Sequence, residues 1–215
     1  MHGLVCFDLD GTLLRGPTVC EVLATPLGRL KEMQRFETLT TEHEISLARL
    51  EMARWWYGEV ELSDLLAHCK NAQLAPGAEE AIAQLQSSGI EVAIASITWK
   101  LAVAWFAERL DIRHYLGTEV TSTGVIEHVW GRTKGQWVRE LARELAVPPT
   151  RIAAVGDSHG DADLLRAADL RFFVGERLPA EVDRVVHIPA ADLREVSSRV
   201  VAAWSSVSSA AASTL

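Results

Sequence analysis

The chain has 215 residues, a length that fits one large domain or a core that carries a smaller insertion. Hydrophobic residues make up 48% and charged residues 23%, which excludes a disordered or fibrous chain. The 29 acidic and 21 basic residues give a net charge of −8, so we expect no nucleic-acid partner and no binding to anionic membranes.

Short apolar runs rich in β-branched and aromatic residues predict buried strands. In chain order they cover residues 4–7, 90–95, 151–155, 170–174 and, as a fifth candidate, 184–188. Helical patterns lie between them at residues 79–86, 98–110, 134–146 and 161–168. This alternation predicts an α/β fold in which helices cover both faces of a parallel sheet.

Residues 15–73 interrupt this alternation with helical patterns alone, at 19–36, 42–57 and 62–69. We name this segment the helical insertion and expect it to form a small helical cap over the sheet edge. The α/β core then comprises residues 1–14 and 74–204. The Trp55-Trp56-Tyr57 cluster in the insertion either packs its helices together or forms a cage for a cationic group. The Ser/Ala-rich residues 205–215 predict a flexible tail.

The cysteines and the apolar runs of the sequence favour a cytoplasmic protein. The three cysteines are far apart and form no C-x-x-C pair, so we expect free thiols in a reducing cytoplasm. Asp8 and Asp10 interrupt the first apolar run, and no signal peptide is expected. The longest apolar stretch, residues 91–107, contains too many polar residues to span a bilayer.

Acidic residues follow two of the predicted strands, at the sheet edge where reactive groups collect in parallel sheets. Asp8 and Asp10 come after the first strand, and Asp157 and Asp161 come after the third. Carboxylates in such proximity repel each other unless a cation lies between them. Mg²⁺ is the natural candidate, because it prefers oxygen ligands, and the lack of His or Cys ligands argues against zinc.

Other residues at these positions suit phosphoryl transfer. Ser96 ends the second strand and offers a hydroxyl and helix-start amides to a phosphate. Lys134 can add a positive charge from a helix start, and Thr12 can donate a hydroxyl. A carboxylate can serve as the nucleophile by forming an acyl-phosphate. The sequence therefore predicts phosphoryl-transfer chemistry on a small phosphorylated metabolite.

These residues occur in the order of the four motifs of the haloacid dehalogenase superfamily, and their strand positions match. The chain resembles that superfamily over residues 4 to about 195, and the place of the insertion resembles the phosphoserine phosphatase-like branch. The resemblance implies a Rossmann-like core with a mobile cap. The motifs are Asp8-Leu9-Asp10-Gly11-Thr12, Ser96, Lys134 and Gly156-Asp157-Ser158-His159-Gly160-Asp161.

The resemblance also implies residue roles. Asp8 would be the nucleophile, and Asp10 would protonate the leaving alcohol and later activate water. Mg²⁺ would be held by Asp8, the backbone carbonyl of Asp10, and Asp157, with Asp161 in support. The phosphoryl oxygens would be held by Ser96, the amide of Ile97, and Lys134.

The chain departs from that branch where the amino acid of the substrate is recognised. A gapless alignment puts Pro17 in place of the glutamate that binds the substrate amine, and Leu50 near the position of the arginine that binds the carboxylate. Arg49 and Arg54 lie close to that position. Ile97 stands where glycine is usual. We therefore expect a phosphatase but do not predict phosphoserine as its substrate.

The sequence leaves three functions open. The favoured one is a Mg²⁺-dependent phosphatase that hydrolyses a small-metabolite phosphate monoester through an aspartyl-phosphate. A phosphotransferase or phosphomutase would use the same groups with an alcohol as acceptor. A non-catalytic phospho-aspartate or binding module of the same fold is the third, although Asp10 and the insertion argue against it. No oligomeric state is predicted.

Overall fold

The computed structural model describes residues 2–190 and 192–212, and within them the main sheet has seven strands. Its order is β6-β5-β4-β1-β7-β8-β9, and every neighbouring pair is parallel except β5 with β6. This arrangement confirms the predicted α/β fold. The strands are β1 (Leu4–Phe7), β4 (Glu91–Trp99), β5 (His114–Val120), β6 (Ile126–Glu127), β7 (Ile152–Gly156), β8 (Leu170–Phe173) and β9 (Val185–His187).

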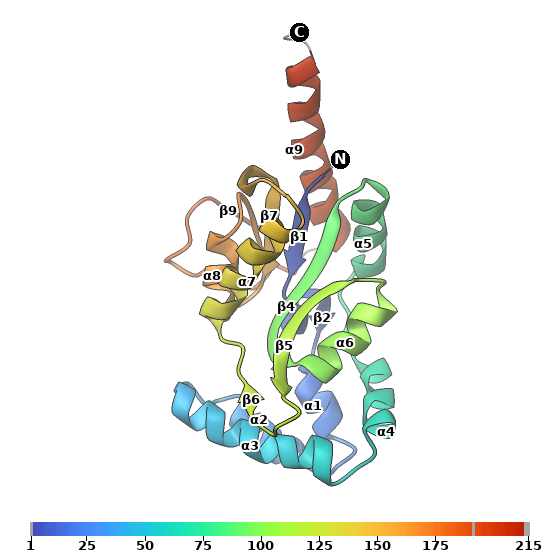
Figure 1. The fold of residues 1–215 in the computed structure, drawn as a ribbon, viewed down its shortest axis with the longest axis vertical. Helices are drawn as coiled ribbons and strands as arrows, with labels where there is room; N and C mark the ends of the chain where they lie inside the picture. Colours follow the sequence, from blue (N-terminus) through green and yellow to red (C-terminus); the bar gives the residue numbers. More distant parts are fainter. Residues whose placement is uncertain (1, 191, 213–215) are drawn as a thin grey trace.

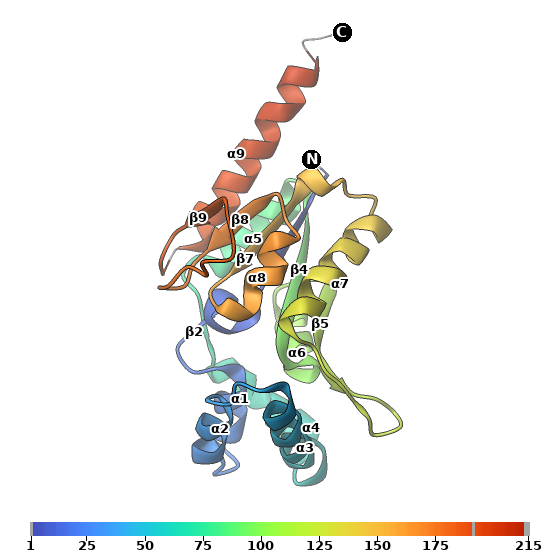
Figure 2. The ribbon, with the colours of Figure 1, turned by 90° about the vertical axis from the view of Figure 1, so that its left-hand side faces the viewer.

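Helices cover both faces of the sheet, as Figures 1 and 2 show. One face packs against α5 (Ala78–Ser87), α6 (Lys100–Arg109) and α9 (Leu193–Ala212). The other packs against α7 (Gly131–Glu144) and α8 (Ala162–Arg166). No helix among the described residues is long and apolar enough to cross a membrane.

The central strand β1 is apolar at every position because helices cover the sheet on both of its faces. Val5 and Phe7 face the α5, α6 and α9 side, whereas Leu4 and Cys6 face the α7 and α8 side. All four are fully buried. A strand that is covered on both faces gains burial free energy from each residue in turn, so it reads as a continuous apolar run rather than as an alternating one.

The helical insertion lies between two short strands, β2 (Leu14–Arg15) and β3 (Gln73–Leu74), which pair in antiparallel fashion. Figure 1 shows it at the bottom of the molecule, at the end toward which the arrows of β1 and β4 point, while both chain ends lie at the top. Its elements are α1 (Val19–Ala24), α2 (Leu30–Phe36), α3 (Glu42–Gly58), α4 (Leu62–Leu66) and the 3₁₀ turn η2 (Ala67–Asn71).

The predicted helix over residues 19–36 is two helices, because Pro26 and the positive-φ Gly28 stand between α1 and α2. Phe36 stacks on Trp55 at 5.5 Å, and Trp55 meets Trp56 edge to face at 5.8 Å. Both tryptophans are buried, at 2% and 0% exposure. The aromatic cluster therefore packs the insertion, and the cage interpretation is wrong.

The prediction that a helix starts at Thr98 is also wrong. Strand β4 continues to Trp99, and α6 begins only at Lys100. Between Ala95 and Trp99 the pairing of β4 with β5 shifts register, so Ser96 lies in a β-bulge and not at a helix start. The reason is local, since β-branched and aromatic residues favour an extended chain and Trp99 buries its ring there.

Strands β5 and β6 were not predicted from the sequence. Three of the seven residues of β5 are polar, and most of the strand is half-buried, so it has no continuous apolar run.

The end of the chain also differs from expectation. Helix α9 runs through Ala212, past the predicted start of the tail at residue 205, since alanine and serine extend the helix that Leu193 begins. Residues 213–215 lie outside the described residues.

Candidate active site

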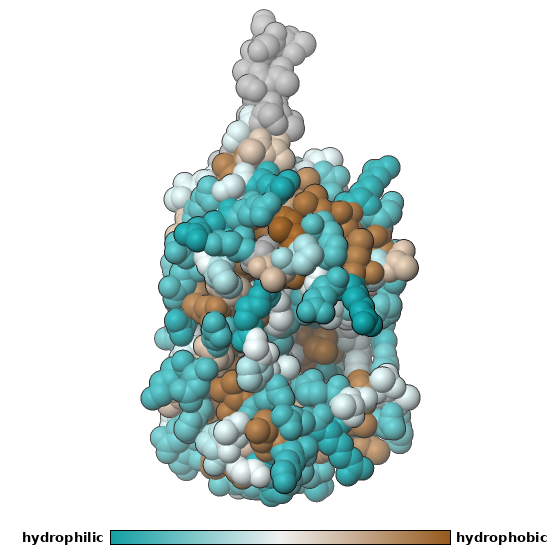
Figure 3. All heavy atoms as spheres, turned by 180° about the vertical axis from the view of Figure 1, so that it is seen from behind, coloured by the Kyte–Doolittle hydropathy of each residue, from teal (hydrophilic) through white to brown (hydrophobic). Residues whose placement is uncertain are grey.

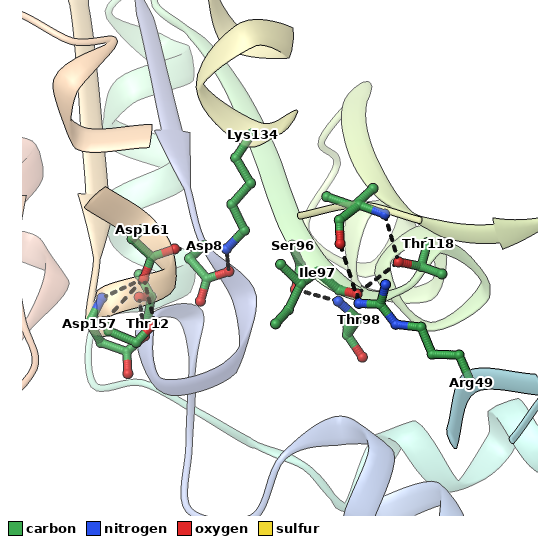
Figure 4. Close-up of polar contacts among 12 residues, drawn as sticks. Asp8, Thr12, Arg49, Ser96, Ile97, Thr98, Thr118, Lys134, Asp157 and Asp161 are labelled. Carbon is green, nitrogen blue, oxygen red and sulfur yellow. Dashed lines mark hydrogen bonds and ion pairs between the residues drawn. The ribbon is translucent and has the colours of Figure 1, made fainter. Parts of the chain in front are cut away.

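Three carboxylates meet where β1 and β7 end. Asp8 follows β1, Asp157 follows β7, and Asp161 ends the short turn η4 (His159–Asp161). Each offers an oxygen, and these oxygens all lie within 4.8 Å of one another. Figure 4 shows the three side chains converging with Lys134 and Thr12. The structure thus brings together three of the four acids that follow the predicted strands, and Asp10 is not among them.

A tight turn after β1 makes this approach possible. The backbone N–H of Asp8 donates to the carbonyl of Val155 at 2.9 Å, which ties the turn to β7. Gly11 in this turn has φ +82°, and a Cβ there would lie 2.1 Å from Oδ2 of Asp157. Only glycine allows both the left-handed backbone and the close contact.

Lys134 links two of the acids. Its Nζ donates to Oδ1 of Asp8 at 2.6 Å and to Oδ1 of Asp161 at 2.7 Å, and the side chain is buried. Burial works to lower the pKa of Lys134, but Asp161 and Asp8 outweigh burial and raise it. Burial, followed by the charge of Asp161, raises the pKa of Asp8 well above its ordinary value, although Lys134 opposes both. Three acids thus share the site with Lys134, which pairs directly with two of them.

Asp161 organises the loop after β7. Its Oδ2 accepts from the backbone N–H of Asp157 and from the N–H and hydroxyl of Ser158, each at 3.1 Å. Thr12 Oγ1 donates to Oδ1 of Asp157 at 3.2 Å, so the Thr12 hydroxyl points at a carboxylate. Burial, then the charge of Asp161, raises the pKa of Asp157 to about 6. Asp161 and Thr12 therefore hold Asp157 in place.

Asp10 is bound differently from the other three acids. Its Oδ1 accepts from the backbone N–H of Val19, the first residue of α1, at 2.7 Å. Burial raises the pKa of Asp10 to about 7, with the Val19 hydrogen bond opposing the shift. A carboxyl group with such a pKa can both donate and accept a proton near neutral pH. Its carboxylate lies outside the cluster formed by the other three.

The acidic cluster fits a magnesium ion. All of its donors are carboxylate oxygens, the hard ligands that Mg²⁺ accepts, and no His or Cys joins them among the described residues. Buried carboxylates with raised pKa values gain most when a cation neutralises them. The residues present therefore suit the ion that the sequence predicted.

The bulge in β4 faces the same region from the other side, as Figure 4 shows. Ser96 is buried, and its Oγ accepts from the backbone N–H of Thr98 at 3.3 Å. Thr98 Oγ1 lies 3.0 Å from Sγ of Cys20 on α1. Ile97 is 45% exposed and borders the cavity. Its side chain takes up space next to the cavity that a glycine would leave open.

A cavity of about 260 Å³ lies between the sheet end and the helical insertion. Figure 3 shows a hollow between these two parts of the molecule, with apolar atoms visible inside it. Polar groups of the core line one end, including Asp8, Asp10, Ser96 and Lys134. The wall that the insertion contributes is mostly apolar and is formed by Met33, Phe36, Leu39, Ile45, Ala48 and Met52.

Two charged residues on the cavity were missed by the gapless alignment. Arg49 turns inward and is only 4% exposed, whereas Leu50 points outward at 50% exposure. Glu37 accepts from Thr18 Oγ1 at 2.9 Å, and burial raises its pKa. Helical periodicity was the available signal for Arg49, because it shares the buried face of α3 with Ala48, Met52, Trp55 and Trp56.

Comparisons with known proteins agree with this geometry. The family model of the haloacid dehalogenase-like hydrolases matches residues 5–166. A phosphoserine phosphatase of Wolinella succinogenes is 29% identical over 206 residues, which cover 90% of this chain and 97% of the relative. Another, of Idiomarina loihiensis, is 29% identical over 178 residues, covering 77% and 79%. A solved substrate-bound phosphoserine phosphatase complex matches the fold with a TM-score of 0.75 at 21% identity, covering 91% of this chain and 97% of that one.

Proposed function

The chain belongs to the haloacid dehalogenase-like hydrolase family, and on that premise we propose that it is a phosphatase which hydrolyses a small-metabolite phosphate monoester through an aspartyl-phosphate. The observation that carries this proposal is the convergence of Asp8, Asp157, Asp161 and Lys134, since Asp8 and Lys134 also line one end of the cavity. The relatives named phosphoserine phosphatase support the same reaction class.

Asp8 is the nucleophile in this proposal. Its buried carboxylate lines the cavity, and the Lys134 ammonium holds its Oδ1 and so fixes its orientation. A carboxylate oxygen attacks phosphorus, the bond to the leaving alcohol breaks, and an acyl-phosphate forms on Asp8. Bound Mg²⁺ would be held by Asp8 and Asp157, with Asp161 supporting them, and would neutralise negative charge on the phosphoryl oxygens.

Asp10 acts as general acid in the first step and as general base in the second. In the first step it donates a proton to the departing alkoxide oxygen, and in the second it accepts one from the water that attacks the acyl-phosphate. Its pKa of about 7 makes both protonation states accessible near neutral pH. The N–H of Val19 keeps Oδ1 in place throughout, so the carboxyl group stays oriented toward the cavity that it lines.

The bulge in β4 and the insertion complete the site. Ser96 Oγ and the amide of Ile97 would bind phosphoryl oxygens, together with Lys134. The insertion would act as a cap that limits water at the acyl-phosphate and selects the leaving group. Thr12 borders Asp157 rather than the cavity, so we assign it a role in positioning that carboxylate.

The cavity offers one acidic and one basic side chain to a substrate, Glu37 and Arg49. These charges complement an amino-acid ester that carries an amine and a carboxylate. Phosphoserine is therefore the first natural substrate to test, although neither residue is at its gapless family position. The three cysteines are free, which supports a reducing compartment such as the cytoplasm.

The test is phosphate release from a generic aryl phosphate. We expect release with Mg²⁺, loss of release with EDTA, and loss of release in Asp8→Asn. Asp64→Asn is the matched control, because Asp64 is exposed on α4, far from the acidic cluster in the chain. A folded wild-type protein that releases no phosphate from a broad panel of esters would contradict the proposal.

A further inference from the structure

Arg49 makes an unusual set of contacts for a buried arginine. It reaches from α3 of the insertion into the core, where Nη2 donates to the carbonyls of Ile97 at 2.9 Å and Val129 at 3.3 Å. Its Nη1 lies 3.0 Å from Nδ1 of His128, and its guanidinium lies over the Trp130 ring at 4.7 Å. No carboxylate of the described residues lies within ion-pair distance of it.

These contacts make Arg49 a bridge between the insertion and the core. The planar guanidinium satisfies several acceptors at once, which a lysine ammonium on a flexible stem does less well. Burial lowers the pKa of Arg49 to about 10, so the group remains charged at neutral pH. Hydrogen bonds from a charged donor to buried carbonyls are stronger than neutral ones, so this bridge helps to dock the insertion on the core.

The Ile97 carbonyl is the acceptor that matters for function. Ile97 lies in the bulge of β4, where pairing with β5 shifts, so its backbone needs other anchors. Thr118 Oγ1 donates to the same carbonyl at 2.9 Å, and that hydroxyl in turn accepts from the N–H of Val129 at 3.0 Å. One donor to the Ile97 carbonyl thus comes from the core and the other from the insertion (Figure 4).

We propose that Arg49 is a positioning residue that fixes the Ile97 carbonyl and thereby holds the Ser96–Thr98 segment in its phosphate-binding form when the insertion is docked. The proposal rests on the proposed function of that segment. This positioning role does not require a carboxylate on the substrate, so it is additional to any contact that Arg49 makes with one. Docking of the insertion and binding of the phosphoryl group are then coupled through the Arg49 side chain.

The experiment uses an aryl phosphate, which has no carboxylate for Arg49 to bind, and inorganic phosphate as a competitive inhibitor. For Arg49→Ala we expect kcat/KM for the aryl ester to fall about ten- to a hundredfold, and the inhibition constant of phosphate to rise in parallel. Arg49→Lys should not restore either value, because it keeps the charge but not the planar fork. Leu50→Ala, an exposed neighbour on α3, should stay within about twofold of wild type.

Thr118→Val probes the same carbonyl from the core side. It should shift both values in the same direction. Its effect should be smaller in the Arg49→Ala background than in wild type, since both residues act on one acceptor. If Arg49→Ala does not fold, Arg49→Met keeps the apolar stem over Trp130 and removes the donors.

Three outcomes would overturn the inference. One is a normal aryl phosphatase activity in Arg49→Ala with a loss confined to phosphoserine, which would make Arg49 a substrate carboxylate ligand only. Another is full rescue by Arg49→Lys, which would reduce its role to charge. The third is strict independence of the Arg49 and Thr118 effects. An inactive wild type would instead count against the proposed phosphatase function, so the two failures are distinguishable.

Discussion

The two ends of the cavity are built differently. At the acid end, Asp8, Asp157 and Asp161 are fixed by hydrogen bonds from Lys134, Thr12 and backbone amides of the adjacent loop. At the insertion end, side chains from α2 and α3 and from the loop between them form an apolar wall with two isolated charges. The first end is preorganised for one reaction, whereas the second can vary its side chains without disturbing the chemistry.

The largest expected effect is on the proton transfers. Asp10→Asn should lower kcat by about 10²- to 10⁴-fold, because the amide can neither donate nor accept the proton. The loss should be greatest for alkyl phosphates, whose leaving groups need a proton, and smaller for an aryl phosphate. Steady-state kinetics with both esters measures the difference. An equal loss with both esters would contradict the assignment of Asp10 as the acid in the first step.

Lys134→Met tests how strongly the acid end depends on the cation that pairs with Asp8 and Asp161. Two buried carboxylates would lose their partner, so the unfolding free energy should fall by about 3–5 kcal/mol in the absence of metal. Lys100→Met is the control, since Lys100 pairs with Glu119 at a half-exposed site and should cost less than about 1 kcal/mol. Urea denaturation of both variants measures this. Similar losses in the two would show that the buried network is not special.

Magnesium should stabilise the protein in a pH-dependent way. The pKa of Asp157 is raised to about 6 in the folded, metal-free protein, so the folded state binds more protons than the unfolded one. Metal-free stability should therefore fall as pH rises from about 4 to 6, and Mg²⁺ should offset this at higher pH, because it binds the deprotonated site.

At a magnesium concentration a hundred times the dissociation constant, the gain should be about 2.7 kcal/mol near neutral pH and much less near pH 4. Thermal unfolding with Mg²⁺ and with EDTA across this range measures it. A gain from Mg²⁺ that is the same at both ends of the range would contradict binding by these carboxylates.

Two glycines sharpen the comparison further. Gly11 and Gly16 both have φ +82°, but a Cβ at Gly11 would strike Asp157, while nothing lies within 4 Å of one at Gly16. Both alanine variants should lose about 1–2 kcal/mol from backbone strain. Only Gly11→Ala should also weaken Mg²⁺ affinity, by about 10- to 100-fold, because it displaces Asp157. Calorimetric titration of Mg²⁺ into both variants separates the two effects.

The acid end could be predicted from the sequence because its residues lie in short motifs at strand ends. A buried parallel strand has a continuous apolar run, and the residues just after it are placed by the sheet itself, as Asp8 and Asp157 are. The position of Lys134 could be predicted in a similar way because it lies near the start of a helix, although α7 begins three residues earlier than predicted.

The insertion end could not be predicted in the same way. Whether Arg49 or Leu50 faces the cavity depends on how α3 docks, and a gapless alignment carries no such information. The bulge at Ser96 was missed because β-branched residues before an apolar helix fit either state, and packing of Trp99 decides between them. Strand β5 was missed because its half-buried face mixes polar and apolar side chains.

The most direct test of the central claim is to look for the covalent intermediate on Asp8. Wild-type protein is mixed with Mg²⁺ and an aryl phosphate, quenched in acid during turnover, and analysed by peptide mass spectrometry. We expect a phosphoryl group on the peptide that contains Asp8, and none in Asp8→Asn. Phosphate release that continues in Asp8→Asn, with no adduct on Asp8 in wild type, would contradict the account.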